Sequence, residues 1–177
     1  MGIMIAFLGQ YIFREMTLMD RKSNNNQYLK TKVFTASQEE LQMMLYDGAI
    51  RFCEQARVAI IDKKIEDSFV LIDKAEKIIM EMINSMKDEV DPEIVGNMRR
   101  LYMFIYDRLV QANMKKDIKK LDEGLKILRE MRETWRLLCE KVQEERNALE
   151  LVGSEIQSAQ NYGSDMVEKW PTLNVEG

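Results

Sequence analysis

Helix-breaking residues are almost absent from the middle of this chain, and this constrains its fold more than any other feature. The 177 residues include only two prolines, Pro92 and Pro171, and most of the eight glycines lie towards the two ends. Proline removes a backbone donor and glycine costs conformational entropy, so long stretches without them favour helices. The length suits one domain with its own core.

Apolar residues recur at steps of three and four in four successive segments, which is the spacing of an amphipathic helix. The spacing predicts helices over residues 38–61, 65–86, 92–112 and 117 to about 160. The predicted core-facing residues are Leu41, Leu45, Gly48, Phe52, Ala56, Ala59, then Ile65, Phe69, Ile72, Ile79, Ile83, Met86, then Ile94, Met98, Leu101, Ile105, Leu109, Ala112, and finally Ile118, Leu121, Leu125, Leu128, Trp135, Cys139, Val142 and Leu149.

Start signals accompany two of these helices. Ser37 followed by Glu40 is a capping box, in which each side chain bonds the backbone N–H of the other residue. Asp91 can cap the third helix, and Pro92 occupies its first position, where a missing N–H costs nothing. Short connections between four amphipathic helices predict an all-α, antiparallel four-helix bundle.

The two ends of the chain differ in charge from its middle. Residues 1–36 carry five basic and two acidic side chains, whereas residues 151–177 carry one basic and four acidic ones. We therefore expect an N-terminal extension and arm over residues 1–36, the bundle over 37–150, and an acidic C-terminal tail over 151–177.

The apolar stretch Ile3–Phe13 has two interpretations. It is shorter than the ~20 residues of a membrane span, and no basic residue precedes it, so neither a span nor a signal peptide is expected. Met16 and Met19 are alternative starts, which would make residues 1–18 an upstream extension of the reading frame. Alternatively, the stretch is a short amphipathic helix that rests on the protein's own apolar surface.

The composition argues against most kinds of catalytic and metal-binding site. With no histidine, the Glu-x-x-His metal sites of helical bundles and histidine-based catalysis are excluded. No acidic residue stands in an apolar stripe, where burial would raise its pKa. We therefore expect no enzyme activity, no cofactor and no metal. Cys53 and Cys139 fit the apolar stripes and are expected to be buried free thiols.

A net charge of −4 also argues against general phosphate binding. The one dense basic cluster is expected at the turn between the third and fourth helices, where it would be solvated. It consists of Lys115, Lys116, Lys119 and Lys120.

The segment from Tyr28 to Phe52 resembles the signature of the flagellar secretion chaperone family FliS. It reads YLKTKVFTASQEEL over residues 28–41 and LYDGAIRF over residues 45–52. Gln38 and Thr31 depart from the family, which has proline and asparagine there. Further matches follow in order and extend the resemblance over residues 28–140: Lys74-Ala75, Ile78-Ile79, Glu93-Ile94, Leu101-Tyr102, Arg108-Leu109, Ala112-Asn113, Asp117 and Trp135.

The resemblance implies a cytoplasmic chaperone that binds the disordered C-terminal region of flagellin, prevents its premature polymerisation and assists its delivery to the flagellar export apparatus. Export-gate components are a second expected partner, and neither nucleic acid nor stable membrane insertion is expected. In the family, a segment before the first long helix covers part of the flagellin site, and here that capping arm maps to Tyr28–Phe34. The alternative is a structural or regulatory adaptor without a flagellin client.

The candidate client-binding residues are Tyr28, Val33, Tyr46, Tyr102, Ile105, Tyr106, Leu109 and Asn113. The run from Tyr102 to Tyr106 is consecutively apolar, so it covers more than one helix face. Either the surplus face binds a client, or the run is a wide interface to two neighbouring helices. Gly48, inside the first helix, is expected to serve close packing rather than client contact.

Overall fold

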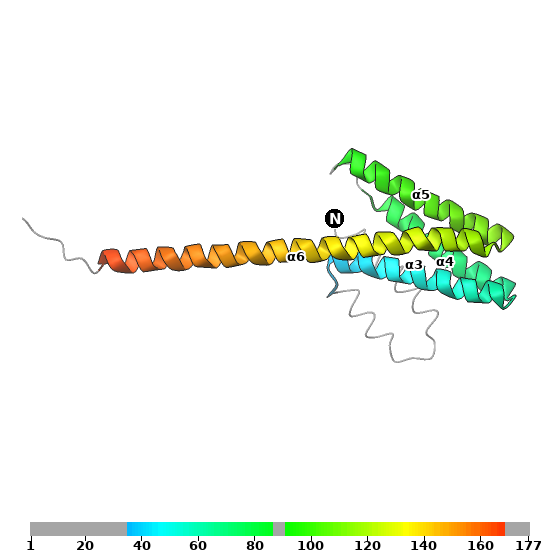
Figure 1. Ribbon diagram of the computed structural model, residues 1–177, viewed down its shortest axis with the longest axis horizontal. Helices are drawn as coiled ribbons and strands as arrows, with labels where there is room; N and C mark the ends of the chain where they lie inside the picture. The colour runs from blue at the N-terminus through cyan, green and yellow to red at the C-terminus, as the bar shows by residue number, and fades with distance from the viewer. Residues whose placement is uncertain (1–34, 87–90, 169–177) are drawn as a thin grey trace, which may run out of the picture. The chain divides into compact units, whose positions relative to one another are not determined.

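A computed structural model of the protein describes residues 35–86 and 91–168, with side chains as far as residue 154. The regular elements of these residues are the helices α3 (Gln38–Ile61), α4 (Ile65–Asn84), α5 (Pro92–Lys115) and α6 (Ile118–Glu168). They run alternately up and down (Figure 1). The predicted all-α four-helix bundle is therefore confirmed. The predicted N-terminal arm lies outside the described residues.

The chain divides into two compact units, residues 1–136 and residues 137–177. The first holds α3, α4, α5 and α6 as far as Arg136, and these helices form the bundle. The second contains the rest of α6. The predicted boundary between bundle and tail, at residue 150, stays a prediction.

Side-chain caps fix the starts of three helices. The Oγ of Ser37 accepts from the backbone N of Glu40 at 3.2 Å, and the Ser37 N donates to a Glu40 carboxylate oxygen at 2.8 Å. The predicted capping box is thus confirmed. The Oδ1 of Asp91 accepts from two backbone N–H groups behind Pro92, each at 3.1 Å. Asp117 caps the start of α6 in the same way, at 2.9 and 3.3 Å.

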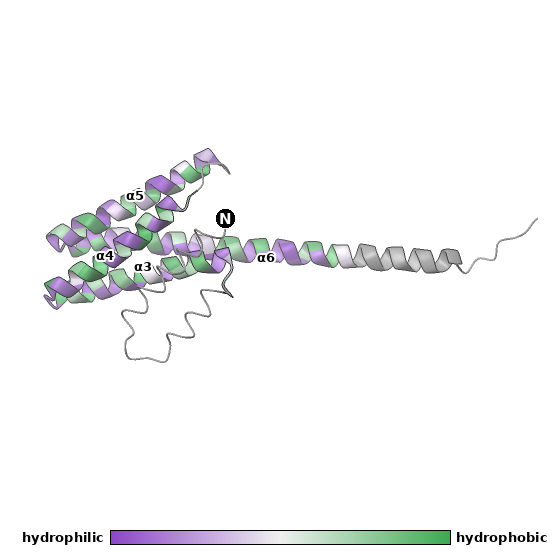
Figure 2. Cartoon of the chain, turned by 180° about the vertical axis from the view of Figure 1, so that it is seen from behind, coloured by the Kyte–Doolittle hydropathy of each residue, from purple (hydrophilic) through white to green (hydrophobic). Residues whose placement is uncertain are grey.

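The core consists of the inward faces of all four helices, and Figure 2 shows hydrophobic and hydrophilic residues alternating along each. Two glycines lie where helices approach closely. A Cβ on Gly48 would be 3.4 Å from Ile78 of α4, and one on Gly124 would be 3.3 Å from the Cβ of Arg108 in α5. The expected packing role of Gly48 is confirmed. The largest fully buried side chains are Tyr46, Tyr102, Phe52, Leu45, Ile72, Ile79, Met82, Ile105, Leu109, Leu121, Leu128 and Cys53.

Several predicted core positions are wrong, and most of those in α4 and α5 lie near the start of the helix. Ile65 and Phe69 of α4 are more than half exposed, while Ile78 and Met82 are buried instead. In α5, Leu101 is exposed and its neighbour Tyr102 is buried. Ile94 of α5 is exposed as well. The other predicted positions of the same stripes are buried, so the predicted face is right over the rest of α4 and α5: Ile72, Ile79, Ile83, Ile105, Leu109 and Ala112.

The ends of two helices also differ from expectation. α4 ends at Asn84, two residues earlier than predicted. α6 continues through Gly163 to Glu168, because a glycine inside a helix costs only about 1 kcal/mol relative to alanine and does not have to end it. Within α6, Val142 and Leu149 are exposed rather than buried.

Neither cysteine forms a disulfide, as expected, but the two differ in burial. Cys53 is fully buried in the core of the bundle, and burial raises the pKa of its thiol to about 12. Cys139 is only half-buried, which corrects the prediction for this residue. Its place on α6 lies beyond Arg136, in the second compact unit.

Candidate functional site

Most of the predicted client-binding residues lie inside the bundle. Tyr46, Tyr102, Ile105 and Leu109 are each at most 1 % exposed, and Asn113 is 8 % exposed. Tyr106 is half-buried and packs against the core. Tyr28 and Val33 lie outside the described residues. Direct client contact stays a prediction for all of them, but in this conformation five of the eight present almost no surface to a partner.

Two of these tyrosines connect α3 to α5. The hydroxyl groups of Tyr46 and Tyr102 are hydrogen-bonded to each other, and the Nε2 of Gln42 donates to the Tyr102 hydroxyl at 3.4 Å. Burial raises the pKa of both phenols, so both stay protonated at neutral pH. Each buried hydroxyl therefore has a partner, as a stable core requires. The pair explains why both residues are buried despite their polar ends.

A second polar cluster surrounds Asn113 at the C-terminal end of α5. Its Nδ2 donates to the backbone oxygen of Phe69 at 3.5 Å and to a Glu76 carboxylate oxygen at 3.4 Å. The Nζ of Lys116 donates to the Asn113 Oδ1 at 2.9 Å. Burial raises the pKa of the Glu76 carboxyl, which corrects the expectation that no acidic group is placed where burial has this effect. The cluster joins α5 to α4.

The outward flank of α5 carries exposed apolar side chains. Ile94, Leu101 and Phe104 follow one another at steps of seven and three, and are 57 %, 44 % and 39 % exposed. Arg108, one turn further, lies with its guanidinium carbon 4.5 Å from the centre of the Phe104 ring. An Nη of Arg108 is 3.5 Å from a carboxylate oxygen of Glu123 in α6. This flank of α5 is therefore the one beside α6.

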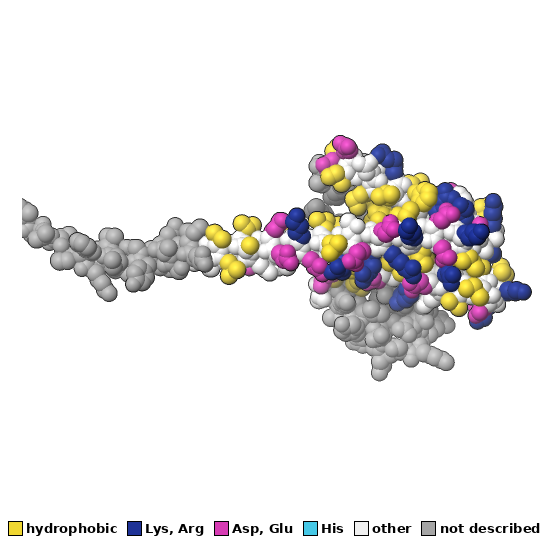
Figure 3. Space-filling view, viewed as in Figure 1, with side chains coloured by type: hydrophobic (Ala, Val, Ile, Leu, Met, Phe, Trp, Pro, Cys, Tyr) yellow, Lys and Arg dark blue, Asp and Glu magenta, His cyan; other side chains and the backbone are white. Residues whose placement is uncertain are grey.

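α6 extends the same apolar area. Ile127 and Met131 follow Glu123 at steps of four, so they lie on the flank of α6 that bears this ion pair. Both are half-buried and pack against the core. Hydrophobic side chains gather between α5 and α6 in Figure 3. We call Ile94, Leu101, Phe104, Ile127 and Met131 the α5–α6 apolar surface.

The prediction missed this surface because Ile94 and Leu101 fit a core stripe. The signal was present in the consecutive apolar run from Leu101 to Ile105, which exceeds what one buried face can hold. The run divides in the structure. Tyr102 and Ile105 point inward, whereas Leu101, Met103 and Phe104 are exposed.

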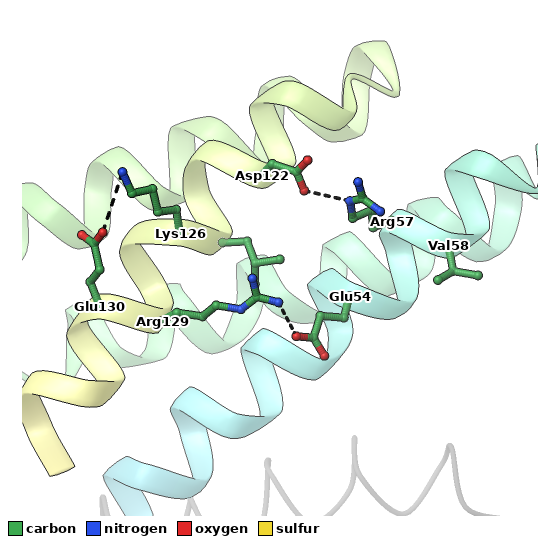
Figure 4. A pocket seen from close by; sticks show the side chains of 8 residues that line it. Glu54, Arg57, Val58, Asp122, Lys126, Arg129 and Glu130 are labelled. Atoms are coloured by element: carbon green, nitrogen blue, oxygen red, sulfur yellow. Dashed lines mark hydrogen bonds and ion pairs between the residues drawn. The ribbon is translucent and has the colours of Figure 1, made fainter.

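A pocket bordered by charged side chains lies on the opposite side of α6, against α3 (Figure 4). Arg57 and Asp122 pair across it at 3.0 Å, and Arg129 and Glu54 at 2.5 Å. All four side chains are about half exposed, and exposed ion pairs of this kind contribute only about 0–1 kcal/mol each. The pocket is thus lined by charges that already neutralise one another. Its other lining residues are Val58, Leu125, Lys126 and Glu130.

Among the described residues, no group of three potential metal ligands comes together. No helix in this part of the chain is both long and apolar enough to cross a membrane. The basic cluster lies at the turn between α5 and α6, as expected, and Lys120 pairs there with Glu123 at 3.0 Å.

Proteins of one family match this chain over most of the bundle. The model of the family "Flagellar protein FliS" matches residues 21–142. The flagellar secretion chaperone FliS of Bacillus subtilis is 31 % identical over 120 residues, which are 68 % of this chain and 89 % of that protein. The flagellar secretion chaperone FliSB of Pseudomonas aeruginosa is 33 % identical over 107 residues, 60 % of this chain and 85 % of that protein. FliS of Campylobacter jejuni is 29 % identical over 111 residues, 63 % of this chain and 87 % of that protein.

Proposed function

Because this chain belongs to the FliS family of flagellar secretion chaperones, we propose that it binds the C-terminal region of flagellin in the cytoplasm. Binding would keep flagellin from polymerising and assist its delivery to the flagellar type III export apparatus. The family is a class of export chaperones rather than enzymes, so the protein acts by stoichiometric binding. Components of the export gate are a second proposed partner.

The observation that carries the proposal in this chain is the α5–α6 apolar surface. A contiguous exposed apolar area on a soluble bundle marks an interaction site. An amphipathic client segment can lay its apolar face on such an area, with its anchors spaced at three and four residues. Arg108 and Glu123 supply a polar end to the area, which would fix the position of the client segment along it.

The buried candidate residues of α5 pack beneath this surface. Tyr102 and Ile105 hold the inner side of α5, which keeps Leu101 and Phe104 turned outward. Tyr106 lies seven residues from Asn113 and thus on the flank of α5 that faces α4. Client contact at Tyr106 is a separate proposal. The arm with Tyr28 and Val33 is proposed to cover the client site until flagellin arrives.

Calorimetry with full-length and truncated flagellin tests the client. The protein should form a one-to-one complex with full-length flagellin and lose it when the C-terminal region of flagellin is removed. Equal affinity for both forms would contradict the assignment of the client region. No binding to either form would favour the adaptor without a flagellin client.

A matched pair of variants on α5 tests the surface. Leu101→Glu places a charge in the α5–α6 apolar surface and should weaken flagellin binding at least about tenfold, since burying an unpaired charge is costly. Met103 has a similar exposure, 47 % against 44 %, but lies about 160° away around the helix. Met103→Glu should leave the affinity within about threefold. Equal losses of flagellin affinity would show that the binding site includes the outer side of α5 at Met103. An unchanged affinity in both variants would exclude α5 as the binding site.

A further inference from the structure

The guanidinium of Arg108 lies at the polar end of the α5–α6 apolar surface and has no close acceptor among the described residues. Its Nη1 donates to the Oε1 of Gln111 at 3.4 Å and lies 3.5 Å from a carboxylate oxygen of Glu123. Its Nη2 lies 3.7 Å from a carboxylate oxygen of Asp107. These distances exceed the roughly 2.7–2.9 Å of a charge-assisted hydrogen bond. The Nε is buried and has no hydrogen-bond partner in the described part of the chain.

Both carboxylates beside Arg108 have closer donors of their own. The Nζ of Lys120 donates to the two carboxylate oxygens of Glu123 at 3.1 and 3.0 Å. The Nε2 of Gln111 donates to a carboxylate oxygen of Asp107 at 2.7 Å. These two carboxylates are therefore already bound, and they leave the guanidinium of Arg108 with long contacts.

The arginines between α3 and α6 differ from Arg108 in this respect. Arg57, Arg129 and Arg132 each approach a carboxylate of the other helix, at 3.0, 2.5 and 2.6 Å. Their side chains are 44 %, 55 % and 34 % exposed, whereas that of Arg108 is 20 % exposed. The least exposed of these four cations thus has the longest ion pairs. Because water compensates a buried charge less than an exposed one, Arg108 has the most to gain from a further acceptor.

We infer that Arg108 binds a carboxylate of the client and that this contact fixes the register of the client segment on the α5–α6 apolar surface. The inference rests on the proposed function and names the chemistry of the client at one end of the site. A guanidinium presents paired donors that bind a carboxylate through both of its oxygens. The carboxylate belongs either to an acidic side chain in the C-terminal region of flagellin or to the C-terminus of flagellin itself.

The position of Arg108 relates this carboxylate to the apolar anchors of the client. The guanidinium carbon lies 4.5 Å from the centre of the exposed Phe104 ring. Leu101 precedes Arg108 by seven residues and so lies on the same flank of α5, about 10 Å away along the helix axis. A client helix lying along α5 would meet Leu101 with an apolar side chain and Arg108 with a carboxylate about seven positions away.

Calorimetry of the full chain with flagellin tests the cation. Arg108→Gln removes the charge and should weaken flagellin binding about tenfold, since a hydrogen bond to a charged group contributes about this factor. Arg108→Lys keeps the charge without the paired donors and should recover only part of the affinity. Arg57→Gln removes an equal charge from α3, on the opposite side of α6, and should leave the affinity within about threefold.

A double-mutant cycle identifies the carboxylate and separates contact from a structural role. Each acidic side chain in the C-terminal region of flagellin is changed to its amide, and a separate flagellin carries a short glycine–serine extension after its last residue. With the natural chain, one of these changes should weaken binding about tenfold, and with Arg108→Gln the same change should have almost no further effect. Coupling to an amide assigns a side chain, and coupling to the extension assigns the terminus. Losses that add fully for every change would overturn the inference.

The same measurements distinguish this inference from the proposed function. If Arg108→Gln binds flagellin as tightly as the natural chain does, the carboxylate contact is wrong and the flagellin client stands. If the natural chain binds no flagellin, both are wrong. Because Arg108 has an unbonded buried donor, Arg108→Gln should not lower the midpoint of urea unfolding. If the midpoint falls, the flagellin changes measured with the natural chain decide, and the absence of a loss in every one of them would overturn the inference.

Discussion

The two halves of α6 have the same apolar spacing and opposite surroundings. Leu121 and Leu128 stand seven residues apart and are fully buried. Val142 and Leu149 continue the series at the same step, and are 44 % and 73 % exposed. A seven-residue step therefore predicts a helix and the direction of its apolar face. Which partner covers that face depends on residues elsewhere in the chain, or on another molecule.

The largest difference between the halves is expected from leucine truncation. Leu128→Ala should lower the free energy of unfolding by about 2–5 kcal/mol, because it leaves a cavity in the core. Leu149→Ala should change it by less than about 0.5 kcal/mol. Urea unfolding measures both changes. Similar losses in the two variants would mean that the halves are equally packed.

Trp135 lies just before the boundary between the compact units and should give an intermediate effect. It is half-buried, packs against the core, and donates from Nε1 to the backbone oxygen of Glu39 at 3.2 Å. Trp135→Ala should cost about 2 kcal/mol, less than the 3–5 kcal/mol typical of a fully buried tryptophan. The same unfolding experiment measures it. A cost below about 1 kcal/mol would place the end of the packed half before this residue.

A pair of glycines should give the smallest effects, with opposite signs. Gly124→Ala brings a Cβ within 3.3 Å of Arg108 and should destabilise the bundle by about 1 kcal/mol. Around Gly153, by contrast, no described atom other than those of its chain neighbours and its own helix backbone lies within 4 Å of an added Cβ. Gly153→Ala should stabilise the helix locally by up to about 1 kcal/mol. Urea unfolding measures the effect of Gly124→Ala, and amide hydrogen exchange measures the effect of Gly153→Ala. Stability changes of the same sign in both variants would contradict the predicted difference between the two halves of α6.

Much of the fold could be predicted from the sequence because its signals are local. The capping box at Ser37, Pro92 at the start of α5, and the apolar steps depend on residues within one helix. They predicted the number and order of the helices in the described part of the chain correctly. The family resemblance over residues 28–140 is confirmed by the match over residues 21–142.

The candidate site was harder to predict, because orientation within a helix depends on tertiary contacts. In the run from Leu101 to Ile105, a rotation of about 100° exchanges a buried residue for an exposed one. The prediction chose Leu101 for the core, whereas the hydrogen bond to Tyr46 draws Tyr102 inward. Residues that belong to the family signature, such as Tyr46 and Leu109, prove to be packing residues in this structure.

Because Cys53 is completely buried, the rate at which its thiol is chemically modified measures how often the bundle opens. With a pKa of about 12, it is almost entirely protonated at pH 8 and has no access to a modifying reagent. Labelling then proceeds only through transiently opened molecules, and its rate reports how often they occur. If flagellin reached the buried tyrosines, the complex would label faster than the free protein. If it docks on the outside of α5, the complex would label more slowly.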